Sequence, residues 1–247
     1  MLPFEVLLLV ASSGALEFYH DVQHLPHQAT LSDSSRISKP LHTYQCFDGN
    51  IADYPSPTHW LSFSDMWHIN REQILSSNGG NTYLQHYIHE AIVKVSRESN
   101  IDARLILALV MGESRGKASS PCVGGNVPRC GILHVPKGSL LDEAQSSEAV
   151  ERMIREGIIG SPERGLGYAQ LVQGKPRVAN VAPGCPFMAA RAYHSGSLRQ
   201  NADQVELDWH NVEDAIFVSD FANRLLGWDG RGEGFNQRRT ESFNGPA

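Results

Sequence analysis

The segment that most constrains how this 247-residue chain can fold is LILALVMGES, at residues 105–114. Seven consecutive apolar residues, 105–111, are followed by Gly112 and a single acid, Glu113. A helix that is apolar on every side is typical of the centre of a hydrophobic core. Asp102 stands just before it, in the place of a helix N-cap. The segment therefore predicts a central buried helix that carries a carboxyl group at its C-terminal end.

A carboxyl group in that position is expected to have a raised pKa. Apolar surroundings disfavour the ionised form, and the C-terminal end of a helix adds negative partial charge. A carboxylic acid of this kind can protonate a glycosidic oxygen near neutral pH. The alternative is a surface glutamate at a helix end, satisfied by water or by Arg115.

Helical periodicity dominates the rest of the chain, and no run of alternating residues predicts a strand. The pattern around Met66 predicts a helix with Ser62 or Ser64 as its N-cap, and a second helix is expected to end at Asn100. The loops are long and rich in glycine. The sequence thus predicts a mainly α protein, with helical segments in 62–75, 81–100, 103–114, 146–160, 186–196 and 211–228.

Composition divides the chain into four parts. An apolar run followed by the small residues Ser13, Gly14 and Ala15 predicts a signal peptide at 1–15 and hence a secreted protein. The polar stretch 16–45 is expected to be a disordered leader, and the glycine-rich stretch 229–247 a disordered tail. Residues 46–228 are expected to form one domain. No run reaches the length of a membrane span, so we expect no membrane insertion.

Four cysteines in an exported chain favour disulfides, with three possible pairings. Cys122 and Cys130 bracket a short Gly/Pro loop that a bridge could close, which leaves Cys46 to pair with Cys185. Their spacings do not fit a zinc site, and we expect neither a metal nor a cofactor. A thiol-based enzyme is a weaker alternative.

The net charge of −6 gives no basic surface for nucleic acid, so no nucleic-acid partner is expected. At 41% hydrophobic residues, the chain can form one core of ordinary domain size. We expect it to act as a monomer.

Four stretches of the chain, in order, resemble the lysozyme-like lytic transglycosylases, and most closely their secreted fungal branch. These stretches are ESRGKASS from Glu113, CGILH from Cys130, GLGYAQLV from Gly165, and AARAYHSGS from Ala189. The resemblance covers about residues 54–228. It implies a compact helical fold around a sugar groove, with or without a minor β element. It also implies cleavage of a β-linked polymer of N-acetylated amino sugars, peptidoglycan or chitin-like.

The resemblance assigns roles by position. Glu113 matches the catalytic acid, which would donate a proton to the glycosidic oxygen and then act as a base. The remaining matched positions are implied to bind substrate or line the groove: Ser114, Gly131, Ile132, Leu133, His134, Gln170, Tyr193 and His194. Tyr193 is implied to lean toward the acid, and Gln170 to orient the sugar.

The chain departs from the family pattern at three polar positions, where it has Gly112, His134 and His194. These changes motivate an alternative function, a glycan-binding or interaction protein on the same fold with weakened catalysis. Many glycosidases use a second carboxylate. Asp142, Glu143 and Glu163 follow the acid in the sequence, and no spacing singles one of them out.

Overall fold

The computed structural model of this chain describes residues 43–47, 51–124, 126–174, 183–195, 212–231 and 234. These residues are mainly helical, as the sequence predicts. The helices are α2 (Phe63–Ser77), α3 (Thr82–Ser99), α4 (Ala103–Ser114), α5 (Ser146–Ile159), α6 (Tyr168–Gln173), α7 (Pro186–Ser195) and α8 (Val212–Leu225). Three short 3-10 helices join them: η2 (Ile51–Asp53), η3 (Pro57–His59) and η4 (Glu143–Gln145).

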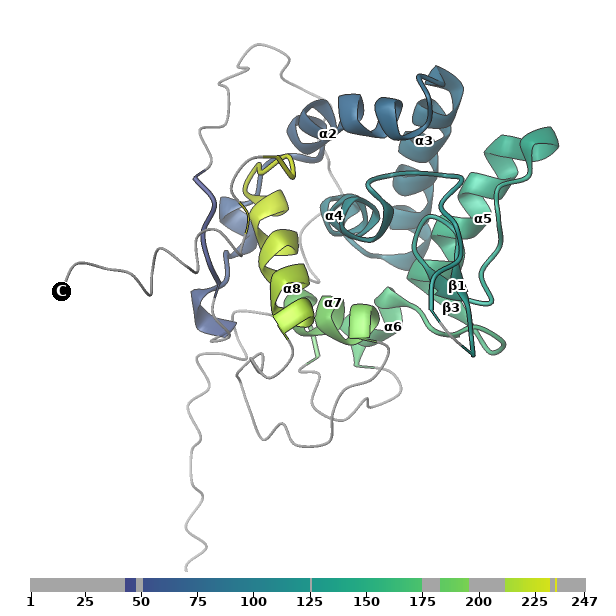
Figure 1. Cartoon of the computed structure of the whole chain (residues 1–247). Helices are drawn as coiled ribbons and strands as arrows, with labels where there is room; N and C mark the ends of the chain where they lie inside the picture. The colour runs from purple at the N-terminus through teal and green to yellow at the C-terminus, as the bar shows by residue number, and fades with distance from the viewer. Residues whose placement is uncertain are drawn as a thin grey trace, which may run out of the picture.

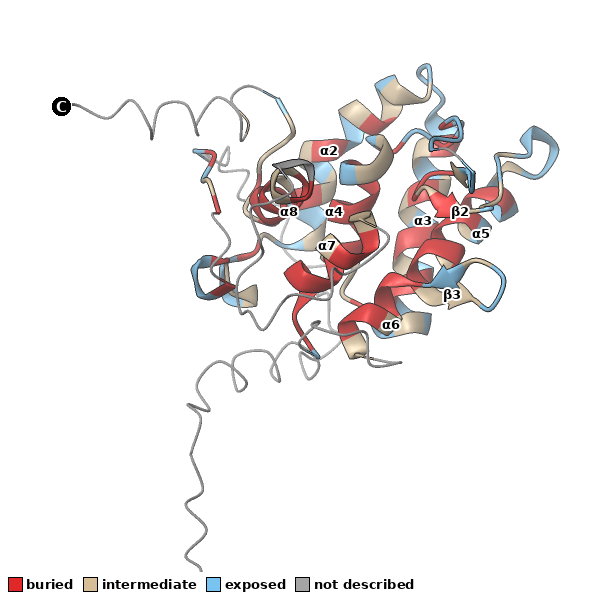
Figure 2. Ribbon diagram, turned by 60° about the horizontal axis from the view of Figure 1, so that its bottom comes forward, coloured by how far each residue is buried: buried red, intermediate tan, exposed pale blue. Residues whose placement is uncertain are grey.

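Helix α4 lies at the centre of this arrangement and is viewed almost end-on in Figure 1. It packs against α2, α3, α7 and α8, and the side chains of Leu105–Met111 are all buried. Helices α3 and α5 form the most extensive helix pair beside it. Figure 2 shows that the buried residues of these helices face one common interior. The apolar run thus forms the predicted central helix.

The helix ends follow from local side-chain chemistry. Ser62 Oγ accepts a hydrogen bond from the Asp65 amide at 3.1 Å and caps α2. Asp102 caps α4 by accepting from the Arg104 amide at 2.9 Å. Asn100 follows the last residue of α3 in a left-handed conformation, with φ +57°. Three predictions, of the caps at Ser62 and Asp102 and of a helix end at Asn100, are therefore confirmed.

Two very short antiparallel hairpins form the minor β element. Strand β1 (Arg129–Cys130) pairs with β2 (Val135–Pro136), and β3 (Gly160–Ser161) pairs with β4 (Gly165–Leu166). The loop between β1 and β2 is anchored to the hydrophobic core by Ile132 and Leu133, which have no exposed surface. This loop reaches the C-terminal end of α4 and carries part of the site described below.

The predicted leader 16–45 is wrong at its C-terminal end. The hydroxyl group of Tyr44 donates to Ser219 Oγ at 3.2 Å, and the Gln45 amide donates to Asn223 Oδ1 at 2.9 Å. Residues 43–47 therefore pack along α8 because its polar side chains satisfy their backbone. The predicted signal peptide 1–15 and the rest of the leader lie outside the described residues.

The start of the predicted tail 229–247 is ordered, which corrects the expectation for its first residues. The Arg231 amide donates to Asp229 Oδ1 at 2.8 Å, and Trp228 Nε1 donates to the Arg231 carbonyl at 3.0 Å. Residues 229–231 thus form a turn against the end of α8. Most of the remainder of the predicted tail lies outside the described residues.

The predicted disulfide Cys122–Cys130 is confirmed and closes the loop that precedes β1. The predicted second bridge, Cys46–Cys185, is wrong for this structure, which does not contain that bond. Cys185 is buried at the start of α7, where its Sγ accepts from the Met188 amide at 3.5 Å. Cys46 lies in the segment that packs along α8. Pairing by elimination carries no information about which elements face each other.

No helix among the described residues combines the length and the apolar character that a membrane span requires.

Candidate functional site

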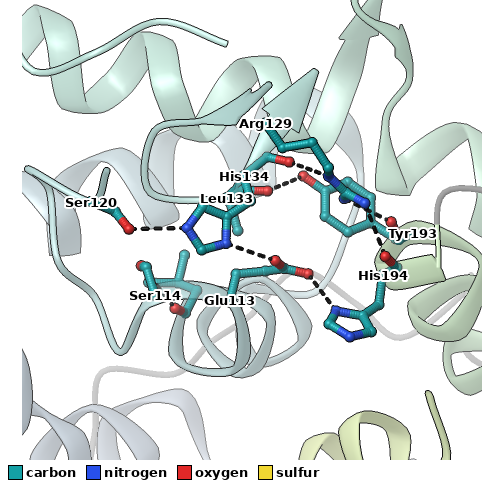
Figure 3. Close-up of polar contacts among 9 residues, drawn as sticks. Glu113, Ser114, Ser120, Arg129, Leu133, His134, Tyr193 and His194 are labelled. Carbon is teal, nitrogen blue, oxygen red and sulfur yellow. Dashed lines mark hydrogen bonds and ion pairs between the residues drawn. The ribbon is translucent and has the colours of Figure 1, made fainter. Parts of the chain in front are cut away.

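Glu113 is the centre of a polar cluster at the C-terminal end of α4 (Figure 3). Its side chain is only 4% exposed. Each carboxylate oxygen faces the Nδ1 atom of a different histidine: Oε2 lies 3.2 Å from His134 and Oε1 lies 3.3 Å from His194. Burial of a carboxylate is costly unless it is paired and hydrogen-bonded, and both conditions are met here.

His134 approaches from the loop between β1 and β2. Its Nε2 atom lies 3.0 Å from the hydroxyl oxygen of Ser120, so both of its ring nitrogens have protein partners. Its backbone has φ +45°, a left-handed conformation that costs a non-glycine residue about 1–2 kcal/mol. The surrounding contacts hold the residue in this conformation. Backbone strain of this kind clusters at functional sites.

His194 approaches from the last turn of α7. Its ring stacks on that of Phe217 from α8, with 4.0 Å between the ring centroids and 6° between the planes. Its side chain is 33% exposed, against 13% for His134. His194 is therefore the member of the cluster that faces outward.

Gly112 makes the stacking of these rings possible. A Cβ atom at this position would lie 2.8 Å from Phe217 Cε2, which is closer than such atoms come in proteins. Glycine within a helix costs about 1 kcal/mol relative to alanine. Gly112 and His194 are therefore coupled, because the glycine leaves space for the ring on which His194 stacks.

Arg129 joins the hairpin to α7. Its guanidinium group donates to three carbonyl oxygens: that of His134 at 2.7 Å, that of His194 at 2.9 Å and that of Tyr193 at 3.0 Å. Two of these carbonyls lie in the last turn of α7, where backbone acceptors lack helical partners. One cation thus fixes the backbone on both sides of Glu113.

Tyr193 is buried beside the cluster but does not hydrogen-bond to Glu113. Its hydroxyl group donates to the Leu133 carbonyl at 2.8 Å. Burial first, and then the charge of Glu113, raise the pKa of Tyr193 far above its ordinary range, so the phenol stays a neutral donor. Tyr193 therefore stabilises the loop between β1 and β2 through this hydrogen bond.

The pKa of Glu113 is lowered, so the expectation of a raised pKa is wrong. Burial does raise it, as the apolar helix suggested. The hydrogen bonds from His134 and His194, the charge of His194 and the charge of Arg129 together outweigh burial. An ionised carboxylate only accepts hydrogen bonds, so each histidine donates from Nδ1 when Glu113 is charged. The cluster keeps Glu113 as an anion.

The other residues singled out by sequence have different partners. Ser114 Oγ donates to the Val110 carbonyl within α4, at 3.4 Å. Gln170 Oε1 accepts from the Gly167 amide at 3.0 Å and caps α6. Gly131, with φ +77°, turns the chain into the loop where Ile132 and Leu133 are buried. Among the described residues, the polar partners of the Glu113 carboxylate are His134 and His194 and not these side chains.

No second carboxylate joins Glu113 among the described residues. Asp142 Oδ1 caps η4 by accepting from the Ala144 amide at 2.9 Å, and Glu143 and Glu163 are exposed. A buried acid that the sequence analysis did not single out, Glu156, accepts from the Ser139 amide at 2.8 Å and pairs with Arg164 at 3.2 Å. Glu156 thereby fixes the segment after β2.

Three contributors to the site were missed by sequence reasoning: Ser120, Arg129 and Phe217. Two of them carried a signal in the sequence: Ser120 ends the stretch ESRGKASS, and Arg129 stands next to a disulfide cysteine. Among the described residues, no group of three or more His, Cys, Asp or Glu side chains is arranged to hold a metal ion. Comparisons of this chain with protein-family models, curated proteins and solved structures gave no match.

Proposed function

We propose that this chain is a secreted glycan-cleaving enzyme with a lysozyme-like fold, whose proton-transfer centre is the Glu113 cluster. Its substrate would be a β-linked polymer of N-acetylated amino sugars, peptidoglycan or chitin-like. The cluster would deliver a proton to the glycosidic oxygen and then accept one from the attacking group.

One observation carries this proposal. Three of the stretches that resemble lytic transglycosylases converge on one buried carboxylate, although His134 lies 21 residues and His194 lies 81 residues from Glu113 in the sequence. The resemblance assigned these residues to one groove before any geometry was known. A buried acid with two titratable partners at one point of the fold is also typical of catalytic sites.

A single carboxylate is sufficient for one version of this chemistry. A hydroxyl or N-acetyl group of the sugar itself can attack the anomeric carbon, which replaces the second carboxylate of a two-carboxylate glycosidase. When a hydroxyl group of the sugar forms the final bond to the anomeric carbon, the product is an anhydro sugar, lighter by one water than the hydrolysis product. The absence of a second acid beside Glu113 among the described residues favours this version.

The experiment measures product release from purified peptidoglycan and from chitin oligomers by mass spectrometry. It compares the wild type with Glu113→Gln, and Glu148→Gln is the matched control because Glu148 is an exposed glutamate in the first turn of α5. We expect product from the wild type and the control, and none from Glu113→Gln. Equal product from all three proteins, or none from any of them, would overturn the proposal.

A second candidate function is a glycan-binding protein on the same fold that has lost catalysis. The observation that favours it is the lowered pKa of Glu113, since a carboxyl group that ionises more readily is less suited to act as an acid itself. Wild type and Glu113→Gln would then bind chitin or wall polymer equally and neither would release product. Release by the wild type alone would exclude this candidate.

Export is part of the proposal. The disulfide Cys122–Cys130 is supporting evidence, because such bonds persist in oxidising compartments. When cells express the full chain, we expect to recover it from the culture medium with its N-terminus cut near Ala15. An uncut protein inside the cell would contradict it.

A further inference from the structure

The two histidines that flank Glu113 are not equivalent. Both present Nδ1 to the carboxylate, at 3.2 and 3.3 Å (Figure 3). His134 also has its Nε2 within 3.0 Å of Ser120 Oγ. The Nε2 atom of His194 has no hydrogen-bond partner among the described residues. Within the part of the chain that the structure describes, His134 therefore has both ring nitrogens in contact with protein groups, whereas His194 keeps Nε2 for a ligand.

The exposed fractions of the three side chains in the cluster also single out His194. Glu113 is 4% exposed, His134 13% and His194 33%. A substrate that reaches this cluster from outside therefore meets the ring of His194 more readily than the oxygens of Glu113. Each of those oxygens is already occupied by a histidine N–H.

The fold also fixes the orientation of the His194 ring. Phe217 holds the plane of the ring by stacking, and Gly112 leaves the space that Phe217 needs. Arg129 holds the backbone carbonyl of His194 at 2.9 Å. A histidine whose Nδ1–H is bound by a carboxylate presents Nε2 as its reactive nitrogen, in a fixed tautomer.

We infer that His194 is the catalytic residue that exchanges the proton with the glycan through Nε2, and that Glu113 is the buried carboxylate that orients it. This inference rests on the proposed function and names the acid and base within it. Glu113 is then a positioning residue.

The proton transfers balance over one cycle. The Nε2–H of the His194 imidazolium moves to the glycosidic oxygen, and the bond from that oxygen to the anomeric carbon breaks, its electron pair staying on the oxygen. Neutral His194 keeps its Nδ1–H on Glu113 Oε1. A hydroxyl group of the sugar, or a water, then forms a bond to the anomeric carbon and gives its proton to Nε2, which restores the imidazolium.

Three charged or titratable groups lie close to His194. Glu113 on α4 faces its Nδ1, Arg129 on β1 donates to its backbone carbonyl, and His134 shares the Glu113 carboxylate with it. The neighbouring contact from α8 is the uncharged ring of Phe217.

The test is the rate of product release at saturating oligomer for the wild type, His194→Asn and His194→Gln. Asparagine and glutamine keep an N–H donor for Glu113 but cannot carry the reacting proton. His68→Asn is the matched control, because His68 is an exposed histidine on α2. We expect a loss of about 100-fold or more in kcat for both His194 variants, with an unchanged unfolding midpoint, and no loss for the control.

The outcomes separate the two proposals. Product from the wild type with His194→Asn within about threefold of it would overturn the role of His194 and leave the proposed function intact. No product from the wild type on either polymer would overturn the proposed function, and with it a role for His194 on glycans.

A second measurement needs no substrate and covers the case in which the His194 variants fail to fold. Nitrogen NMR of the histidine rings in the wild-type protein reports which nitrogen carries the proton. We expect neutral His194 to carry its proton on Nδ1, and this preference to weaken in Glu113→Gln. A proton on Nε2 with a bare Nδ1 toward Glu113 would overturn the inference.

Discussion

Replacing Arg129 by methionine removes one cation that holds both sides of the site. Methionine keeps the unbranched aliphatic stem but loses the three hydrogen bonds to the carbonyls of His134, Tyr193 and His194, which measure 2.7, 3.0 and 2.9 Å. At about 1 kcal/mol net for each hydrogen bond, the expected loss is about 3 kcal/mol in the free energy of unfolding.

The same change should alter the chemistry of the cluster. Arg129 lowers the pKa of Glu113, so its removal should raise that pKa toward the ordinary range of a glutamate. Freed from the guanidinium group, the last turn of α7 should also let the ring of His194 move. We therefore expect product release to fall together with stability.

Urea unfolding of the two proteins measures the stability difference, and Arg152→Met is the matched control. Arg152 is an exposed arginine on α5, and substitutions at such positions change stability by about 0.5 kcal/mol or less. A loss below about 1 kcal/mol for Arg129→Met, with unchanged ring-nitrogen shifts of His194, would refute the idea that Arg129 holds the site together.

Three further changes and one titration test other parts of the account. Gly112→Ala places a methyl group 2.8 Å from a ring carbon of Phe217 and should cut product release at least tenfold, whereas an active variant with an unshifted ring would contradict the packing argument. Tyr193→Phe leaves a buried carbonyl without its donor and should cost about 1–3 kcal/mol in urea unfolding; a cost near zero would show that water replaces the phenol. Loss of the disulfide Cys122–Cys130, by substitution of both cysteines with serine, should cost about 2.5 kcal/mol from the entropy of loop closure, and an unchanged midpoint would refute that. Because the pKa of Glu113 is lowered in the folded protein, its charge adds stability above the unfolded pKa of about 4.3, and this stability is lost as pH falls through the folded pKa. In urea unfolding measured at several pH values, Glu113→Gln should therefore lose less stability at acid pH than the wild type. An equal dependence of the free energy of unfolding on pH in the two proteins would contradict this.

The helices could be predicted because their signals are local. Seven apolar residues in a row predict a central helix, and Asp102 and Ser62 cap helices through contacts only two or three residues away. The short loop between Cys122 and Cys130 is local in the same sense, and its disulfide was predicted correctly.

The chemistry of the site could not be predicted in the same way, because it depends on residues that the fold brings together. The apolar run around Glu113 implied a raised pKa, and two histidines, 21 and 81 residues away, reverse the direction of the shift. Arg129 and Phe217 belong to no motif, yet they orient the ring of His194. Pairing Cys46 with Cys185 because they are the two remaining cysteines also failed, since that reasoning ignores which elements face each other.

The most direct test of the central claim is product release from peptidoglycan and chitin oligomers by the wild type and Glu113→Gln, followed by mass spectrometry. The account predicts amino-sugar fragments from the wild type and no product from Glu113→Gln, and a mass lower by one water than the hydrolysis product would identify the sugar hydroxyl as the attacking group. Equal release by both proteins, or no release by either, would contradict a catalytic centre at Glu113.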